Sequence, residues 1–358
     1  MYNKYKDILI VKIIFLSIFL GMNYFIVAQS LHVPAEIQAL MKTSAISYEM
    51  DQVTQNLILE EEKYPLVEKG WYAIANEEGI QLQKLTIQTD EETEKYREKG
   101  EDYLKKQKYS KAIKLYLKAL DQNPMDNELL KGLGKSYLGD NKDQLAIECF
   151  QKVVTQNQVD FDAHLYLAQT YELKNELDLA IKHITLAHIY NRNDSKIIEK
   201  LQDIYGHQGL KYDLWDLSPV YKIEKISADV VKIQYQVNPW RGYAACKAVW
   251  EYEADYREEM NQMSTASTEV IQEKECLFNA LIEYKRLGDG KEKYPALASL
   301  SLALLNKNVN EYILYEILSR KDPLLLYGLS KESQERLMNY LLTTRVGKSL
   351  PLEKKAGT

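Results

Sequence analysis

Two short motifs carry residue types that do chemistry in other proteins, a nucleophilic serine and a phosphate-binding lysine. Residues 134–137 read Gly-Lys-Ser-Tyr, like the turn that exposes a catalytic serine, but Leu138 stands where that turn needs its second glycine. Residues 347–349 read Gly-Lys-Ser, like the end of a phosphate-binding loop, but Leu342 stands where that loop needs its first glycine. Neither motif therefore predicts a catalytic or nucleotide-binding site.

The histidines and acidic residues give no stronger signal. His183 and His188 are five residues apart on a predicted helix, so their side chains diverge more than the one-turn spacing of a metal-binding pair allows. Neighbouring acids such as Glu91 and Glu92 are typical of surface charge, although two carboxylates distant in sequence could meet in an acid–base site. We predict no catalytic residue, no metal and no cofactor, and keep an enzyme as the alternative.

The elements that would position any site are helices, because the chain repeats itself every 34 residues between Thr93 and Asp194. Each unit reads as two helices joined by a polar turn, such as residues 94–105 and 109–120. Because one helix pair cannot bury its apolar stripe alone, neighbouring pairs must stack, and residues 195–206 are predicted to cover the last open face. The recurring small and aromatic residues are Ala112, Ala146 and Ala180, with Tyr103, Tyr137 and Tyr171.

This pattern closely resembles the tetratricopeptide repeat over about 102 of the 358 residues. The resemblance implies an α-solenoid in which the first helix of each pair lines a concave groove that holds a peptide or a partner helix. The groove residues that it implies are Arg97, Glu101, Lys105, Lys131, Lys135, Leu138, Asp162, Gln169 and Glu172. Some relatives clamp the carboxylate of chaperone tails with asparagines, but Glu101 and Gly132 stand at those positions. The alternative for the groove charges is a solvated helix face.

The first 28 residues predict a secretory signal peptide. Lys4 and Lys6 precede an apolar stretch, and we place cleavage after Ala28. An uncleaved anchor is the alternative, although the unbroken apolar part, residues 13–22, is short for a membrane span of roughly 20 residues. We therefore expect an exported protein, periplasmic, in the cell envelope or secreted, and favour a bacterial host.

The composition is that of a folded protein with 46% hydrophobic and 27% charged residues. Its formal net charge of −6 gives it no general electrostatic reason to bind nucleic acid or an anionic membrane. We expect a protein or peptide partner, no nucleic acid, and no membrane contact after signal cleavage.

The segments beside the repeats predict a small amount of β-structure in a mainly α fold. We divide the chain into a signal peptide (1–28), a small α/β lead-in (29–90), an array of three helix pairs with a capping helix (91–208) and a C-terminal domain (209–358). The lead-in should hold a short helix and a hairpin, and the C-terminal domain a hairpin followed by helices. The predicted ranges are 34–42, 71–75 with 80–87, 219–226 with 229–237, 270–287, 296–306, 309–319 and 331–343.

Three cysteines and a dense group of aromatic residues complete the candidates. Cys149 reads as a packed apolar residue. Cys246 and Cys276 could pair in an oxidising compartment, but the sequence alone does not place them near each other, so both states stay open. The aromatic group is more typical of a core helix than of a sugar- or peptide-binding platform. Its members are Trp240, Tyr243, Trp250, Tyr252 and Tyr256.

Together these observations predict a non-enzymatic adaptor or scaffold that binds a protein or peptide partner in the concave groove. One alternative is an enzyme or small-ligand-binding protein, with its activity in the C-terminal domain and repeats that recruit the substrate. The other is a structural subunit that self-associates. The sequence does not identify the partner.

Overall fold

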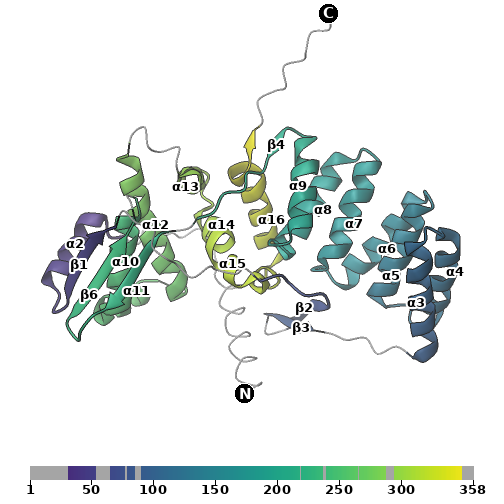
Figure 1. Ribbon diagram of the computed structural model, residues 1–358, viewed down its shortest axis with the longest axis horizontal. Coiled ribbons are helices and arrows are strands. Elements are labelled where there is room, and N and C mark those ends of the chain that lie inside the picture. The colour runs from purple at the N-terminus through teal and green to yellow at the C-terminus, as the bar shows by residue number, and fades with distance from the viewer. Residues whose placement is uncertain are drawn as a thin grey trace, which may run out of the picture.

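The structure, a computed structural model, is mainly helical and elongated (Figure 1). A solenoid of paired helices forms one end, a small sheet with its covering helices forms the other, and the last helices of the chain lie between them. It describes residues 31–53, 65–76, 79–84, 90–217, 219–236, 239–264, 266–287 and 294–348. The predicted signal peptide lies outside these residues. No helix among them is both long and apolar enough to cross a membrane.

Three helix pairs and a seventh helix form the solenoid, as the 34-residue period predicts. Four of the helices begin at an aspartate whose side chain accepts hydrogen bonds from backbone N–H groups of the first turn, namely Asp90, Asp126, Asp160 and Asp194. The pairs are α3 (Glu91–Lys105) with α4 (Tyr109–Gln122), α5 (Asn127–Gly139) with α6 (Asp143–Gln156), and α7 (Phe161–Leu173) with α8 (Leu177–Tyr190), followed by α9 (Ser195–Gly206).

Close approach between helices explains why small residues recur in the repeat. A Cβ atom on Gly134 would lie 2.5 Å from the ring of Phe150, and one on Gly132 would lie 2.4 Å from the ring of Tyr116. Both rings are fully buried. Each aromatic ring therefore occupies the space that a glycine leaves open on the facing helix.

The turn inside each helix pair is built around one residue in the left-handed region, at Gln107, Asn141 and Asn175. Lys307 adopts the same conformation, with φ 59°, between α13 (Pro295–Leu305) and α14 (Val309–Ile313). In both regions the backbone N–H of the residue after the left-handed one makes the same hydrogen bond across the turn. Lys108 N donates to Tyr103 O (2.8 Å), and Asn308 N donates to Ala303 O (2.9 Å). The C-terminal region thus contains a helix hairpin with the turn geometry of the solenoid.

Two segments far apart in sequence form the small sheet. β1 (Ser47–Gln52) pairs in parallel with β6 (Val230–Tyr235), which pairs antiparallel with β5 (Tyr221–Lys225). The predicted hairpin before the C-terminal helices is confirmed. One face of the sheet packs on α10 (Trp240–Tyr252), where the buried residues are Val231, Ile233, Tyr235, Ala244 and Ala248.

The predicted lead-in is divided between two places. Its helix α2 (Pro34–Thr43) and strand β1 lie with the sheet, while its hairpin, β2 (Trp71–Asn76) and β3 (Gly79–Lys84), lies beside the solenoid (Figure 1). Both predicted elements therefore exist, but they do not pack together as one unit. Residues 85–87 of the predicted hairpin lie outside the described residues.

The C-terminal region is helical at the predicted positions. Of the five aromatic residues in the predicted group, Trp240, Tyr243, Trp250 and Tyr256 are buried, which confirms the core interpretation for them, whereas Tyr252 is half-buried. The remaining elements are α11 (Ala254–Gln262), α12 (Thr268–Lys285), η2 (Leu314–Leu318), α15 (Ser319–Lys321), η3 (Pro323–Leu326), α16 (Lys331–Tyr340) and η4 (Leu341–Arg345), with β4 (Leu210–Lys211) paired to β7 (Gly347–Lys348).

A buried polar network joins this region to the end of the solenoid. Arg345 Nε lies 2.9 Å from Glu316 Oε1, and Arg192 Nη2 lies 3.8 Å from Glu316 Oε2. Arg192 also stacks on the ring of Tyr315, and His188 Nε2 lies 2.5 Å from the Tyr315 hydroxyl. The solenoid and the C-terminal helices therefore share one core instead of forming two independent ones.

Candidate functional site

The predicted groove residues of the first helix pair lie on one face of α3. Arg97 forms ion pairs with Glu94 and with Glu101, where Nη1 lies 2.8 Å from Oε1. All three side chains keep contact with solvent, and Lys105, one turn after Glu101, is exposed. This end of the groove is a solvated surface whose charges largely balance each other.

Lys131, on α5, is buried instead of facing an open groove. Only 3% of the residue is exposed, and its Nζ lies 2.7 Å from Glu128 Oε1, 3.0 Å from Asp160 Oδ2 and 3.7 Å from Asp162 Oδ2. Burial alone lowers the pKa of the Lys131 ammonium, but the three carboxylates outweigh it and raise the pKa. Lys131 therefore lies neither at the open groove surface that the sequence predicts for it nor on a solvated helix face, but at the centre of a buried group of ion pairs.

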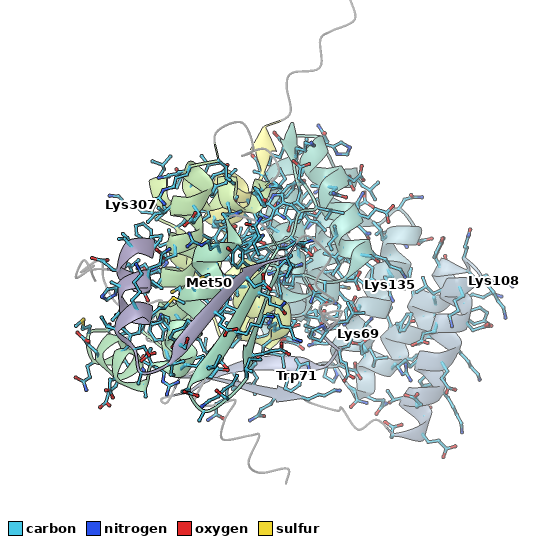
Figure 2. The ribbon with its side chains drawn as sticks, turned by 60° about the vertical axis from the view of Figure 1, so that its left-hand side comes forward. Met50, Lys69, Trp71, Lys108, Lys135 and Lys307 are labelled. Atoms are coloured by element: carbon cyan, nitrogen blue, oxygen red, sulfur yellow. The ribbon has the colours of Figure 1, made fainter. Side chains whose placement is uncertain are left out.

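Lys135, one turn further along α5, differs from Lys131. Among the described residues no carboxylate lies within ion-pair distance of its ammonium group, which stands 5.4 Å from the centre of the Tyr166 ring. Burial, and then the nearby charge of Lys69, lowers the pKa of Lys135. Figure 2 shows Lys69 and Lys135 on the same side of the solenoid. Lys135, the half-buried Tyr166 ring and the half-buried Leu138 thus bring a positive charge, an aromatic ring and an apolar side chain close together.

Two of the predicted groove residues on α7, Asp162 and Glu172, also have charged partners. Glu172 lies 2.6 Å from Lys200 Nζ, and its other oxygen lies 3.5 Å from His207 Nδ1. Glu172, His207 and Asp203 are close enough to ligate one metal ion, but Lys200 Nζ also lies 2.7 Å from Asp203. The Lys200 ammonium group thus already binds two of the three residues that a metal ion would need. Gln169, one turn before Glu172, is half-buried.

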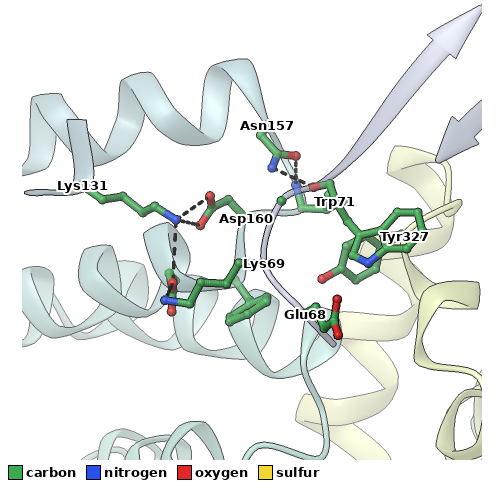
Figure 3. A pocket seen from close by; sticks show the side chains of 11 residues that line it. Glu68, Lys69, Trp71, Lys131, Asn157, Asp160 and Tyr327 are labelled. Carbon is green, nitrogen blue, oxygen red and sulfur yellow. Dashed lines mark hydrogen bonds and ion pairs between the residues drawn. The ribbon is translucent and has the colours of Figure 1, made fainter. Parts of the chain in front are cut away.

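A segment of the chain itself, residues 65–72, lies along the solenoid. Asn191 Oδ1 accepts a hydrogen bond from Val67 N (3.1 Å), and Asn157 Nδ2 donates one to Trp71 O (2.9 Å). Between these two contacts, Lys69 forms an ion pair with Asp162 (Figure 3). This 65–72 segment therefore covers Lys131 and the start of α7.

The asparagines that hydrogen-bond to the 65–72 segment recur with the period of the repeat. Asn123, Asn157 and Asn191 stand at the same place in successive repeats, at 157 − 123 = 34 and 191 − 157 = 34. Asn123 Nδ2 donates to Thr93 Oγ1 (3.2 Å), whereas the other two bind backbone of the segment. Asparagine suits this use because its amide both donates and accepts hydrogen bonds.

The contact between the 65–72 segment and the solenoid is closed. The cavity left between them has a volume of about 10 Å³, no more than a single water needs. Lys131, Asp160, Lys69 and Tyr327 are among the residues that line it (Figure 3). This part of the groove has no room for a partner while the segment is in place.

Two histidines that seemed unrelated in the sequence meet inside the third helix pair. His164 Nδ1 lies 2.9 Å from His183 Nδ1. Burial lowers the pKa of His164 to about 4 and that of His183 to about 3, and the His164 charge adds to the second shift. They replace Leu130 and Cys149 of the preceding repeat, a change that could have drawn attention to them. His188, as predicted, does not join them, since it contacts Tyr315 instead.

Comparison with known families identifies the solenoid. The tetratricopeptide repeat model matches residues 97–158 and again residues 132–193. The middle of this chain is an array of tetratricopeptide repeats. The matched residues include the six helices α3 to α8 in large part, with the 34-residue register expected from the sequence.

Solved structures, tetratricopeptide repeat domains among them, resemble this array. The first such domain of Spaghetti (RPAP3) bound to an HSP90 peptide is 22% identical, with a TM-score of 0.32, and covers 34% of this chain and 98% of that one. The Yersinia enterocolitica secretion chaperone SycD with a peptide of the translocator YopD is 17% identical, with a TM-score of 0.32, and covers 34% and 97%. The Sgt2 domain from Aspergillus fumigatus is 18% identical, with a TM-score of 0.32, and covers 36% and 91%. No curated protein matches the sequence.

Proposed function

We propose that this protein is an exported, non-enzymatic adaptor that binds a protein or peptide partner in the concave groove of its repeat array. The observation that carries the proposal is the surface formed by Lys135, Tyr166 and Leu138. It combines a lysine that has no ion pair among the residues the structure describes, an aromatic ring and a partly exposed leucine. Such a mixture of a charged, an aromatic and an apolar group suits contact with another polypeptide.

The partner binds the part of the groove that the 65–72 segment leaves open. This part consists of the exposed face of α3 and the second halves of α5 and α7, and includes Arg97, Lys105, Lys135, Leu138 and Gln169. The ion pairs of Lys131 and Asp162 hold α5, α7 and the 65–72 segment together beside this part of the groove. The export part of the proposal rests on the N-terminal sequence. The expectation of no nucleic-acid partner rests on the net charge of −6.

Partner capture from the native envelope by crosslinking tests the proposal. Lys135→Glu is expected to lose the captured partner, because it reverses the charge at the centre of the open groove. Lys114→Glu is the matched control, since Lys114 is an exposed lysine on α4, outside the groove. Capture that both variants retain, with both chains folded by circular dichroism, would contradict groove binding.

A further inference from the structure

The two cysteines of the C-terminal region meet between α10 and α12. Cys246 Sγ and Cys276 Sγ lie 2.9 Å apart, and neither residue has any exposed surface. Both are free thiols in the structure. Because a disulfide bond is about 2.05 Å long, the two sulfur atoms would need to approach by only about 0.9 Å to bond.

Loss of the two thiol hydrogen atoms would leave the neighbouring hydrogen bonds intact. Cys276 donates to Cys246, which in turn makes a long contact of 3.8 Å with Glu275 Oε2. That oxygen also accepts hydrogen bonds from Trp250 Nε1 (2.6 Å) and from the Tyr256 hydroxyl (2.7 Å). No buried acceptor on Glu275 therefore depends on the thiol hydrogen.

We propose that Cys246 and Cys276 form a disulfide in the mature protein, which covalently joins α10 to α12. In the reaction the two thiols lose two electrons and two protons to a disulfide oxidant, which becomes two thiols, and one S–S bond forms. The proposal is independent of the partner-binding function and requires only an oxidising environment during folding.

The timing of the reaction follows from burial. Burial raises the pKa of both thiols, so the reactive thiolate is scarce in the folded chain. The bond therefore forms while α10 and α12 come together, before the site closes. Once formed, it fixes the position of α12, which holds the backbone of His32: Glu275 Oε1 accepts from His32 N (2.8 Å), and Asn279 Nδ2 donates to His32 O (2.9 Å).

Cysteine mapping of the full chain tests this inference. The chain is refolded with reduced and oxidised glutathione, unfolded in denaturant, alkylated and analysed by mass spectrometry. We expect one alkyl group, on Cys149, because the other two cysteines, on α10 and α12, are bonded to each other. We also expect a linked peptide pair that contains Cys246 and Cys276. Three alkyl groups, or glutathione adducts without the linked pair, would overturn the proposal.

Cys276→Ala provides the matched control. This variant should carry two alkyl groups with or without reductant, and its urea midpoint should not respond to reductant. The wild-type midpoint should fall when reductant is added, because the cross-link restricts the unfolded chain. A wild-type midpoint that reductant leaves unchanged would count against the bond. Should the variant fail to fold, the wild-type mapping decides alone.

Discussion

The repeat array and the C-terminal region use the same helix turn but different cores. Gln107 and Lys307 hold the same left-handed position in the two regions. In the array, the space between helices is filled by one ring against one glycine, as with Phe150 and Gly134. In the C-terminal region, Tyr312 stands where alignment on the turn places Ala112, and Glu316 carries a charge into the core.

This difference shows what a repeat requires. A regular small-and-large pattern lets each helix pair stack on the next mainly through apolar contact, to which the buried Lys131 adds ion pairs with Asp160 and Asp162. The C-terminal hairpin is buried on several sides at once, so its contacts are irregular and partly polar. Its stability should therefore depend on keeping buried charges paired, whereas that of the array should depend on filled volume.

The largest expected effect tests the apolar core of the array. Phe150→Ala empties a fully buried site and should lower the free energy of unfolding by about 4 kcal/mol. Tyr137→Ala removes a half-buried ring of the same repeat and should cost about half as much. Urea unfolding followed by circular dichroism measures both. Equal losses would show that burial does not set the cost within the array.

The next effect tests the polar core of the C-terminal region. Glu316→Gln leaves Arg192 and Arg345 without their buried carboxylate and should cost about 3 kcal/mol. Glu332→Gln is the control, because Glu332 is exposed and pairs with Arg336 at the surface, where about 0.5 kcal/mol is expected. A loss below 1 kcal/mol for Glu316→Gln would remove the contrast between the two cores.

A third, smaller effect separates two lysines one helical turn apart. Lys131→Ala leaves Asp160 and Asp162 without their shared cation and should lower the free energy of unfolding by about 2 kcal/mol. Lys135→Ala should change it by less than about 0.5 kcal/mol, since its ammonium group forms no ion pair with a carboxylate of the described residues. The same urea titration applies. A larger loss for Lys135→Ala would reverse our assignment of structural and binding roles.

The smallest effect is a pH dependence inside the array. The folded pKa values of His164 and His183, about 4 and about 3, lie below the ordinary value of about 6.5, so the unfolded chain binds protons first as the pH falls. Stability is therefore present above pH 6.5 and decreases toward pH 4, by about 1 kcal/mol between pH 7 and pH 6.

The preceding repeat supplies the control for this pH effect. The double variant His164→Leu, His183→Cys restores the residue types of Leu130 and Cys149. Urea midpoints should fall less between pH 7 and pH 6 in the variant than in the wild type. Parallel curves would mean that the histidine pair does not cause the pH dependence.

The sequence predicts the array well because its contacts are local and periodic. The capping helix begins and ends where expected, at Ser195 and Gly206, since an apolar face and an aspartate cap define it. The C-terminal helices follow from the same helical period. The hairpin of β5 and β6 follows from alternating residues close together in the chain.

The remaining features depend on contacts between distant segments, which leave no local pattern. β1 pairs with β6 at Ser47 and Val230, and neither strand's sequence specifies its partner. Lys131 occupies a predicted groove position, but the 65–72 segment that covers it lies outside the repeats. The approach of Cys246 to Cys276 likewise requires the packing of α10 on α12.

Site-specific photo-crosslinking tests the central claim most directly. A photoreactive residue is placed at position 135 in the groove or at position 114 on α4, and the full chain is irradiated in cells of the organism that encodes it. Groove binding predicts a covalent adduct with a second protein from position 135 and none from position 114. No adduct from position 135, or the same adduct from both positions, would contradict it.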